Sequence, residues 1–581
     1  MKSNTLFKEH MLQYKFSYMI GTALLSISCL LQLYIPQVLE TFTDQLQGMS
    51  ITSEEIISLA WLIAGIGILL AVFRATARIA LLRLARLIEK NVRQRLFVKW
   101  EGLSNEYFSR QRIGDLMSHA VNDINILREV GMMGVFALVE AAVLIVIAIA
   151  AMASTVHAGL TALVMLPLPV LAYMAYRFRT QIEVRTTRVQ EAIGQLTSRV
   201  QEFCAGIRVV KAYVQEEQEL DKFKQDNELN VATNQKLIES NSFFTALSQA
   251  IVGFSYLLSV VFGGLLVMRS SITLGEFVAF NTYLTMLIPP VENLGRVINV
   301  FQRGRAADIR LRSILNTPAA VVDAEEVQRV PDLKGHIEFK GLSFRYPDQS
   351  REVLEDIQLT VPAGSSLAIV GKVGSGKTTL VHLLLRLYNP PEGTLFMDGI
   401  DIRSIPLKQL RQSIGFVPQE HMLFSTTIGE NIAFDPKEYT FKQITEAAKI
   451  AQVHDNIIEF PRQFDTSLGE RGVSLSGGQR QRVSIARALI KEPSILIFDD
   501  SLSAVDAETE ERILAELKRM MKNRTTIITS HRLSAIRHAD QIVVMDQGRI
   551  VEKGTHRELM KQGGMYASIY HMQTMNRVME G

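Results

Sequence analysis

Six long apolar runs in the first 300 residues constrain the fold of this chain more than any other feature. They lie at about 18–39, 57–80, 131–153, 157–177, 243–268 and 277–300. Each is close to the roughly 20 residues that a helix needs to cross a bilayer core. One or two such runs could be buried helices of a large soluble domain, but six are hard to bury that way. We therefore expect residues 1–300 to form an all-α transmembrane domain of six spanning helices.

Charge and cysteine content argue against several other classes of protein. The net charge is only +3 at pH 7, so charge gives no argument for a nucleic acid partner. The two cysteines, Cys29 and Cys204, lie in unrelated contexts, which excludes a disulfide framework and a CxxC metal site. No small-residue cleavage site follows the first apolar run, which favours a retained span over a signal peptide.

Basic residues near the span ends predict how the spans are oriented. The connections 41–56 and 154–158 contain no Lys or Arg, and 269–275 contains one, whereas 84–130 alone contains eight. We therefore expect a multi-pass protein of the cell membrane with both termini and the segments 84–130 and 178–242 in the cytoplasm. These two segments contain no proline and many helix formers, so each is expected to be a helical arm and not merely a solvated loop. A 20-residue helix would reach about 30 Å beyond the membrane.

The last 240 residues have a different pattern. Residues 301–336 are polar and mixed, and we expect a linker there. Over residues 337–581, short β-like runs alternate with helical patterns, which predicts an α/β domain with a largely parallel sheet. The β-like runs are His336–Phe344, Ser366–Val370, Ile495–Phe498, Thr525–Thr529 and Gln541–Met545.

A phosphate-binding loop follows the second of these runs. GKVGSGKT, Gly371–Thr378, comes directly after the apolar strand and before an apolar helical pattern, which is the context that GxxxxGK[ST] requires. Lys377 is expected to reach the β- and γ-phosphates, and the Thr378 hydroxyl to ligate magnesium. The expected ATP-binding residues of this loop are Gly371, Lys372, Val373, Gly374, Ser375, Gly376, Lys377, Thr378 and Thr379.

Further short motifs lie before and after this loop. LSGGQ, residues 475–479, opens a helix whose N-terminus can approach an anion. FRYP places Tyr346 where its ring can stack on adenine, and TSHR places His531 after an apolar strand, where it can donate to a γ-phosphate. Taken singly, each of these is weak evidence, because a Tyr before Pro is often a turn and a strand-end His is often only a polar surface residue.

The run ILIFDD ends a buried strand in two acids, Asp499 and Asp500. One acid at this place commonly holds magnesium, and the second activates water. The ordered set GKVGSGKT, FVPQ, LSGGQ, ILIFDD, SAVD and TSHR resembles the ATPase of ABC transporters. With the spans fused N-terminally, nearly the whole chain is similar to an exporter-type half-transporter, and most of all to one half of the bacterial heterodimeric multidrug exporters.

This resemblance implies roles for the matching residues. Asp499 binds magnesium through water, Gln419 senses magnesium and links to the arms, and Asp506 lies at a dimer seam. Two ATP molecules are held between two such domains, so the active unit is a dimer with a second half-transporter. The implied groups are Asp500, His531 and Gln419 for catalysis, Thr378, Gln419 and Asp499 for Mg²⁺, and Ser476, Gly477, Gly478 and Gln479 closing over the partner's ATP.

The second acid departs from the family pattern, which has Glu where this chain has Asp500. Aspartate retracts the carboxylate by somewhat over ~1 Å, and misplacement of that size can cost about 100-fold in rate. We expect this chain to form a degenerate ATP site and to need a partner that supplies Glu. The alternative is that Asp500 still acts as the base in a slow, symmetric homodimer.

Within the membrane, Glu140 lies in the middle of an apolar run. A carboxylate there is costly, so it is a candidate for cation recognition in a substrate cavity, or for a structural contact with a neighbouring helix. Pro289 and Pro290 are expected to break or kink the sixth span, as a cavity wall, a hinge or a packing kink.

The expected function is ATP-driven export of hydrophobic or cationic small molecules, with ATP and Mg²⁺ as the ligands of the ATPase. The direction of transport rests on the family resemblance. A homodimeric lipid or peptide exporter is one alternative, and an ATP-gated channel or regulator is another. The six spans argue against a soluble ATPase that acts on DNA or ribosomes.

Overall fold

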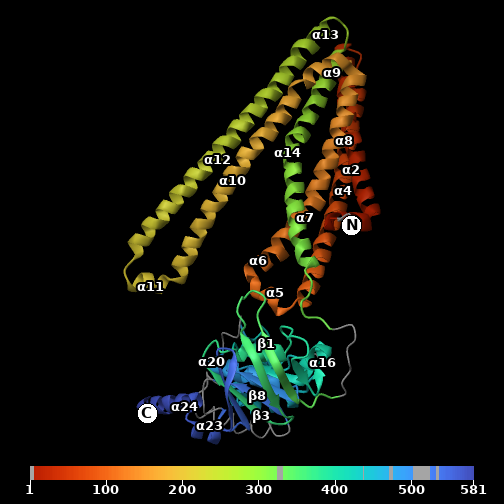
Figure 1. Cartoon of the computed structure of the whole chain (residues 1–581). Helices are drawn as coiled ribbons and strands as arrows, with labels where there is room; N and C mark the ends of the chain where they lie inside the picture. Colours follow the sequence, from red (N-terminus) through yellow and green to blue (C-terminus); the bar gives the residue numbers. More distant parts are fainter. Residues whose placement is uncertain are drawn as a thin grey trace. The chain divides into compact units, whose positions relative to one another are not determined.

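The computed structural model describes residues 5–323, 332–435, 437–469, 475–500, 524–530 and 536–580 (Figure 1). The chain divides into two compact units. The first comprises Met1–Glu101 and Ile113–Thr317, and the second comprises Gly102–Arg112 and Pro318–Gly581. A short segment from the first half of the sequence therefore belongs to the C-terminal unit.

The described part of the first unit is helical throughout, as predicted. Long and short helices alternate in the described residues, and π-helical turns keep several of them continuous. The helices are α1 (Leu6–Gln13), α2 (Lys15–Gln32), α3 (Tyr34–Gln47), α4 (Ser53–Glu101), α6 (Ile113–Ser118), α7 (Ile124–Glu129), α8 (Val135–Ala151), α9 (Ala158–Met165), α10 (Pro167–Ala205), α11 (Ile207–Ala212), α12 (Glu216–Leu258), α13 (Gly264–Met268) and α14 (Leu274–Asn316).

Four helical stretches of the described chain are long and apolar enough to span a membrane. They are Lys15–Gln47, Ser53–Glu101, Ile113–Met165 and Glu216–Met268. The other two predicted spans lie in α9 with the start of α10, and in α14. Helix α14 carries Asn281, Thr282 and Thr285 within its apolar run, and these polar side chains lower its mean hydropathy. Six spans therefore remain compatible with this fold.

The two segments predicted as arms, 84–130 and 178–242, are helical in the structure. Helix α4 continues well past the apolar run 57–80, and α10 and α12 lie side by side and are joined at their far ends by α11 (Figure 1). Because the same helices continue out of the apolar runs, movement of an arm and movement of its spans are mechanically linked.

Ion pairs join α4, α7 and α14 beyond the apolar runs. Glu89 on α4 is buried and accepts from Arg93 Nη2 at 2.8 Å and from Arg128 Nη1 at 3.1 Å. Asp123 accepts from Arg310 Nε on α14 at 3.0 Å. Charge-assisted hydrogen bonds of this kind fix geometry as well as adding attraction, so the three helices are held together where the arm begins.

Helix α14 continues through Pro289 and Pro290 to Asn316. The prolines therefore do not break the sixth span, which corrects the expectation of a break. Neither proline has an N–H, so the carbonyls four residues earlier, of Thr285 and Met286, lack their usual helical donor. The predicted linker range 301–336 includes the helical end of α14.

The second unit contains two sheets. A six-stranded sheet has the order β10-β9-β3-β8-β7-β6, in which only β10 is antiparallel to its neighbour, and a four-stranded antiparallel sheet has the order β2-β1-β4-β5. The strands are β1 (Ile337–Phe344), β2 (Leu354–Val361), β3 (Ser366–Gly371), β4 (Leu395–Met397), β5 (Ile400–Asp401), β6 (Ile414–Val417), β7 (Ile495–Asp499), β8 (Thr525–Thr529), β9 (Gln541–Asp546) and β10 (Arg549–Gly554).

The parallel strands are apolar on both faces because each face is covered by a separate core. Along β3, Ala368 and Val370 belong to one core and Leu367 and Ile369 to the other. The first core contains α20 (Gly477–Leu489) and the second contains α15 (Lys377–Leu384) and the four-stranded sheet. This is the burial that near-continuous apolar runs predict, and it confirms the α/β prediction.

Helix α5 (Asn105–Arg110) lies in the segment that joins the second unit. Asn105 Nδ2 donates to the hydroxyl of Tyr388 at 3.2 Å, and Arg110 Nε donates to Asp348 Oδ2 at 2.6 Å. These contacts attach α5, which lies within the arm 84–130, to the ATPase half of the chain. Asp348 is close to Tyr346 in the sequence.

Candidate functional site

The loop between β3 and α15 has a backbone that only glycine permits at two positions. Gly376 has φ +100°, and a Cβ there would lie 2.7 Å from Leu354 Cδ2 and 3.0 Å from the Val353 carbonyl. A Cβ on Gly371 would lie 2.6 Å from Ser375 Oγ. The loop is therefore packed against the start of β2 and folded on itself, as a glycine-rich phosphate-binding loop requires.

Lys377 lies at the start of α15 and folds back over this loop. Its ammonium donates to the carbonyls of Gly371 at 2.8 Å and Lys372 at 2.9 Å. Burial lowers the pKa of Lys377, and the carboxylates of Asp500 and Asp499 oppose that shift. An anion bound at this loop would likewise favour the charged form.

Ser375 Oγ in the same loop is buried without a hydrogen-bond partner among the described residues. A buried hydroxyl without a partner is costly. A phosphate oxygen in the loop would satisfy it, so the loop fits the anion that its motif predicts.

Asp499 ends β7 beside the phosphate loop. It is 3% exposed, and its Oδ1 accepts from the Thr529 hydroxyl at 2.6 Å and from the Thr378 hydroxyl at 3.3 Å. The structure therefore brings together the two residues predicted for magnesium, one from α15 and one from β7. Carboxylate and hydroxyl oxygens are the ligands that Mg²⁺ prefers, together with water and phosphate.

Asp500 follows directly and has an unusual backbone. Its φ is +46°, a left-handed conformation that costs about 1 kcal/mol or more for a residue with a Cβ. Two hydrogen bonds hold it there, from its N–H to the carbonyl of Thr529 at 2.9 Å and to the Thr529 hydroxyl at 3.0 Å. The backbone at the start of this side chain is thus held by Thr529 of β8, and the Asp side chain that extends from it is one methylene shorter than Glu.

Tyr346 lies on the other side of the loop. Its hydroxyl donates to Thr379 Oγ1 at 3.1 Å, and its ring packs edge-on against Tyr388 with centroids 5.0 Å apart. Burial raises the pKa of the Tyr346 hydroxyl. Since Tyr388 also accepts from Asn105, a contact path runs from α5 to the phosphate loop, which sequence reasoning did not find.

Gln419 is exposed and lies two residues beyond β6. Strand β6 is parallel to β7 and pairs Val417 with Phe498, so Gln419 lies at the same edge of the sheet as Asp499. The following segment is organised by Asn431 and by Arg487 of α20, which sequence reasoning missed. Arg487 donates to the Asn431 carbonyl at 2.7 Å, and burial lowers its pKa to about 10.

The LSGGQ residues form the N-terminus of α20. Ser476 Oγ accepts from the Gln479 N–H at 3.2 Å, and Gln479 Oε1 accepts from the Ser476 N–H at 2.9 Å. This is a reciprocal capping box, and the spacing of Ser and Gln in the motif is a signal from which it could have been predicted. Gly477 and Gly478 add no side chain, so the helix end stays open to a ligand.

Two predicted residues, His531 and Asp506, lie outside the described residues. Within the described ranges, no group of three or more His, Cys, Asp and Glu side chains is placed to hold a metal ion. A magnesium ion bound here would take the Thr378 hydroxyl and the Asp499 carboxylate as ligands, together with phosphate and water oxygens.

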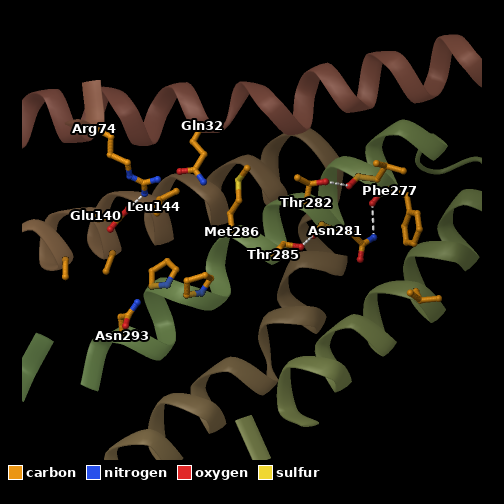
Figure 2. Close-up of a pocket in the computed structure, with 16 residues that line it drawn as sticks. Gln32, Arg74, Glu140, Leu144, Phe277, Asn281, Thr282, Thr285, Met286 and Asn293 are labelled. Carbon is orange, nitrogen blue, oxygen red and sulfur yellow. Dashed lines mark hydrogen bonds and ion pairs between the residues drawn. The ribbon is translucent and has the colours of Figure 1, made fainter. Parts of the chain in front are cut away.

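A second candidate site lies in the first unit. A cavity with a volume of ≈ 750 Å³ opens between helices of the transmembrane region (Figure 2). Its lining mixes apolar and uncharged polar side chains with one opposite-charge pair. The lining residues are Gln32, Arg74, Ala137, Glu140, Ala141, Leu144, Val260, Phe277, Val278, Asn281, Thr282, Thr285, Met286, Pro289, Pro290 and Asn293.

Glu140 lines this cavity and forms an ion pair with Arg74 of α4 (Figure 2). Glu140 thus lines a cavity and also makes the expected contact with a neighbouring helix, while its role in cation recognition stays a prediction. Sequence reasoning missed its partner, although a signal was present, because Arg74 is a charged residue inside the run 57–80. Pro289 and Pro290 also line the cavity, which favours the cavity-wall interpretation of that pair.

Comparison with known families identifies both halves of the chain. A model of the ABC transporter transmembrane region matches residues 18–291, and the ABC transporter model matches residues 354–503. The chain is 38% identical over 579 residues to the protein of Bacillus subtilis named "Probable multidrug resistance ABC transporter ATP-binding/permease protein YheI", covering 98% of this chain and 97% of that protein.

Other relatives have different names. An "ATP-dependent lipid A-core flippase" of Syntrophus aciditrophicus is 37% identical, with 84% of this chain and 80% of that protein covered. Among solved structures, a bacterial Atm1-family ABC exporter with ATP bound matches with a TM-score of 0.80 and 27% identity, covering 97% of this chain and 98% of that one. The chain therefore belongs to the ABC transporter family, as a multi-pass membrane protein fused to an ATP-binding ATPase domain.

Proposed function

We propose that this chain is one half of a heterodimeric, ATP-driven multidrug exporter and that it contributes the degenerate ATP site. The main support for this proposal is the geometry of Asp500. Its backbone N–H is held by Thr529, and its side chain is one methylene shorter than Glu. The ATPase domain and both termini lie in the cytoplasm in this proposal, as the basic residues of the connecting segments suggest.

In the proposed ATP site, the phosphates lie in the Gly371–Thr379 loop and the adenine stacks on Tyr346. Lys377 exchanges its two carbonyl contacts for phosphate oxygens, and the Ser375 hydroxyl gains a partner. Thr378, Asp499 and Gln419 hold magnesium, which supplies neutralisation of the charge on the phosphates. His531 donates to the γ-phosphate.

Asp500 is the proposed general base for the attacking water. Since its backbone position is set by two hydrogen bonds to Thr529, the domain cannot easily shift it forward to make up for the missing methylene. A water held about 1 Å too far from its base reacts slowly. Binding of ATP needs none of this chemistry, so the site is expected to bind ATP well and hydrolyse it poorly.

The signature residues support an unequal pair. Ser476, Gly477, Gly478 and Gln479 keep the full LSGGQ motif, whose helix end is formed by the capping box. These residues would close over ATP bound to the partner, where a Glu completes the chemistry. An intact signature beside a shortened base is the combination that one competent and one degenerate site require.

The cargo in this proposal is a hydrophobic or amphipathic small molecule taken from the cytoplasm or inner leaflet. The names of the Bacillus subtilis relative and of an Escherichia coli relative, "Multidrug resistance-like ATP-binding protein MdlA", which is 33% identical over 563 residues, favour this class. The cavity at Glu140 is the proposed place of binding.

The test is the ATPase rate of the purified full chain without a partner. We expect slow turnover, and we expect Asp500→Glu to raise it by roughly 10- to 100-fold because the longer side chain restores the position of the base. Asp500→Asn is the matched control, which keeps the length of Asp and removes the base. Brisk turnover of the unmodified chain that disappears in Asp500→Asn would mean that Asp500 is a competent base and that the site is not degenerate.

A homodimeric lipid exporter is the second candidate, and the flippase relative favours it. Cross-linking or mass measurement of the chain in nanodiscs separates the two, because a homodimer forms without a second chain. Uptake into inverted vesicles separates both from an ATP-gated channel. An exporter concentrates a dye against its gradient only with ATP, whereas a channel equilibrates it.

A further inference from the structure

The ion pair between Arg74 and Glu140 lies on the cavity wall, inside the apolar runs of α4 and α8 (Figure 2). The side chains remain 37% and 23% exposed, respectively, so both charges can be reached from the cavity. Among the lining residues that the structure describes, these two are the only ionisable ones. The described wall therefore has two opposite charges and no net charge.

Such a wall is unfavourable for a simple cation. A permanent cation that binds Glu140 must separate it from Arg74, and the guanidinium is then left without a counter-charge in a region of low dielectric. Leaving one member of a partly buried pair alone removes the attraction that offsets its desolvation. An amphipathic anion has the same difficulty with the roles reversed, because it would bind Arg74 and strand Glu140.

A ligand with both charges avoids this cost. Within the described part of the chain, the pair is joined through Nη2 of Arg74 and Oε1 of Glu140. A guanidinium has five N–H donors and a carboxylate has two oxygens, so each group keeps bonding capacity while the pair stays formed. A zwitterion can lie antiparallel to the pair and add two favourable contacts without breaking the first.

The rest of the cavity suits an amphiphile. Leu144, Val260, Phe277 and Met286 supply an apolar wall for a tail or ring. The volume of ≈ 750 Å³ falls within the range of about 300–1,000 Å³ that is usual for sites of drug-sized ligands. Asn281 and Thr285 already bond within the protein, through Ser259 and Tyr256, so they shape the wall more than they hold a charge.

We propose that this cavity binds amphipathic zwitterions, with the cationic group against Glu140 and the anionic group against Arg74. The inference rests on the proposed export function, because it assigns the substrate class of the same transporter. It narrows that class away from permanent cations, which a lone Glu140 would have favoured.

The test measures equilibrium binding to the full chain in nanodiscs without ATP. Three fluorescent probes share one dansyl-decyl tail and end in a trimethylammonium, a sulfobetaine or a sulfonate, and binding to empty nanodiscs is subtracted. We expect the sulfobetaine probe to bind at least about tenfold more tightly than either charged probe. Equal or tighter binding of the trimethylammonium probe by the unmodified chain overturns the proposal.

Two single substitutions are expected to move the preference in opposite directions. Arg74→Gln frees Glu140 and should make the trimethylammonium probe the tightest ligand, whereas Glu140→Gln should favour the sulfonate probe. The exchanged pair, Arg74→Glu with Glu140→Arg, keeps both charges and should retain the preference for the sulfobetaine. Preferences that are the same in all these variants would contradict a role for the pair.

A competition experiment on the unmodified chain needs no substitution. Tetraphenylphosphonium and tetraphenylborate have nearly the same shape and opposite charge, and neither should displace the sulfobetaine probe efficiently. Efficient displacement by one of them alone counts against the proposal. Binding is measured without ATP, so its result does not depend on transport. Selective binding of the sulfobetaine probe without ATP-driven uptake would refute only the export function. Export of another class of molecule without zwitterion binding would refute only this inference.

Discussion

The nucleotide site and the membrane cavity are built in opposite ways. In the nucleotide site, the positions of Lys377, Asp499 and Asp500 follow from a backbone that is fixed by strand pairing, glycine conformations and short hydrogen bonds. In the cavity, side chains project from continuous helices, and the charged groups among the described lining residues are held by the contact between Arg74 and Glu140. Chemistry on phosphates needs atoms placed to a fraction of an ångström, whereas binding of varied amphiphiles needs an adaptable wall.

We therefore expect the two sites to respond differently to similar substitutions. Even a small change of side chain in the nucleotide site should have a large effect on ATP binding or hydrolysis, because the backbone there is held in place. Conservative substitutions on the cavity wall should be absorbed by neighbouring side chains. Three predictions test this contrast, in order of decreasing effect.

The largest effect is expected for Lys377→Ala. It removes a buried ammonium that is placed over the loop by two carbonyls. A hydrogen bond to a charged group contributes about 1.5–3 kcal/mol, so ATP affinity should fall by roughly 10- to 100-fold. Equilibrium binding of a fluorescent ATP analogue measures this. Asp500→Asn serves as the comparison and should leave affinity nearly unchanged, and an equal loss in both variants would contradict the separate roles of these residues.

A smaller effect is expected for Tyr388→Phe. The change removes the hydroxyl that accepts from Asn105 and keeps the ring that packs on Tyr346. ATP affinity should stay within about twofold, while coupling of hydrolysis to transport should weaken by a few-fold, in line with about 0.5–1.5 kcal/mol for one hydrogen bond.

The measurement for Tyr388→Phe is the ratio of transported dye to ATP hydrolysed, with the partner present. Tyr388→Ala is the matched control, since it also removes the ring contact and should weaken ATP binding. If Tyr388→Phe lowers ATP affinity as much as Tyr388→Ala does, the hydroxyl acts on the nucleotide site and not on the contact with α5.

The smallest effect is expected for Met286→Leu on the cavity wall. The two side chains have similar volume, and such exchanges usually cost less than about 1.5 kcal/mol. The thermal midpoint of the chain and the ranking of the three dansyl probes should both be preserved. A reordered ranking would show that the apolar wall, and not the ion pair, sets ligand class, which would remove the contrast between the two sites.

Much of the second unit could be predicted because its signals are local. The predicted runs match β1, β3, β7, β8 and β9 to within about a residue. For β3, β7 and β9 the reason is burial on both faces, which makes the strands largely apolar along their length. Strands β2, β4, β5, β6 and β10 were not predicted. Strands β4 and β5 are only three and two residues long, and no residue of β10 is fully buried, so none of these three has a long apolar run.

The first unit was predicted more coarsely. Apolar length predicted where helices run, but not that α14 continues through Pro289 and Pro290. A helix can lose two backbone hydrogen bonds when surrounding helices hold it, and that support is a tertiary property. The contact between Asn105 and Tyr388 joins residues 283 positions apart, which no local pattern shows.

The sequence alone was enough to predict the apolar runs that span the membrane, the phosphate-binding loop, and the two acids, Asp499 and Asp500, of which the second is one methylene shorter than Glu. These depend on residue type, short spacing and apolar length, all of which are local. Only the tertiary structure decided that Glu140 is paired with Arg74, that Asp500 is held by Thr529 in a left-handed conformation, and that α5 belongs to the ATPase half. Each of these joins distant segments of the chain, and packing alone selects which distant residues meet.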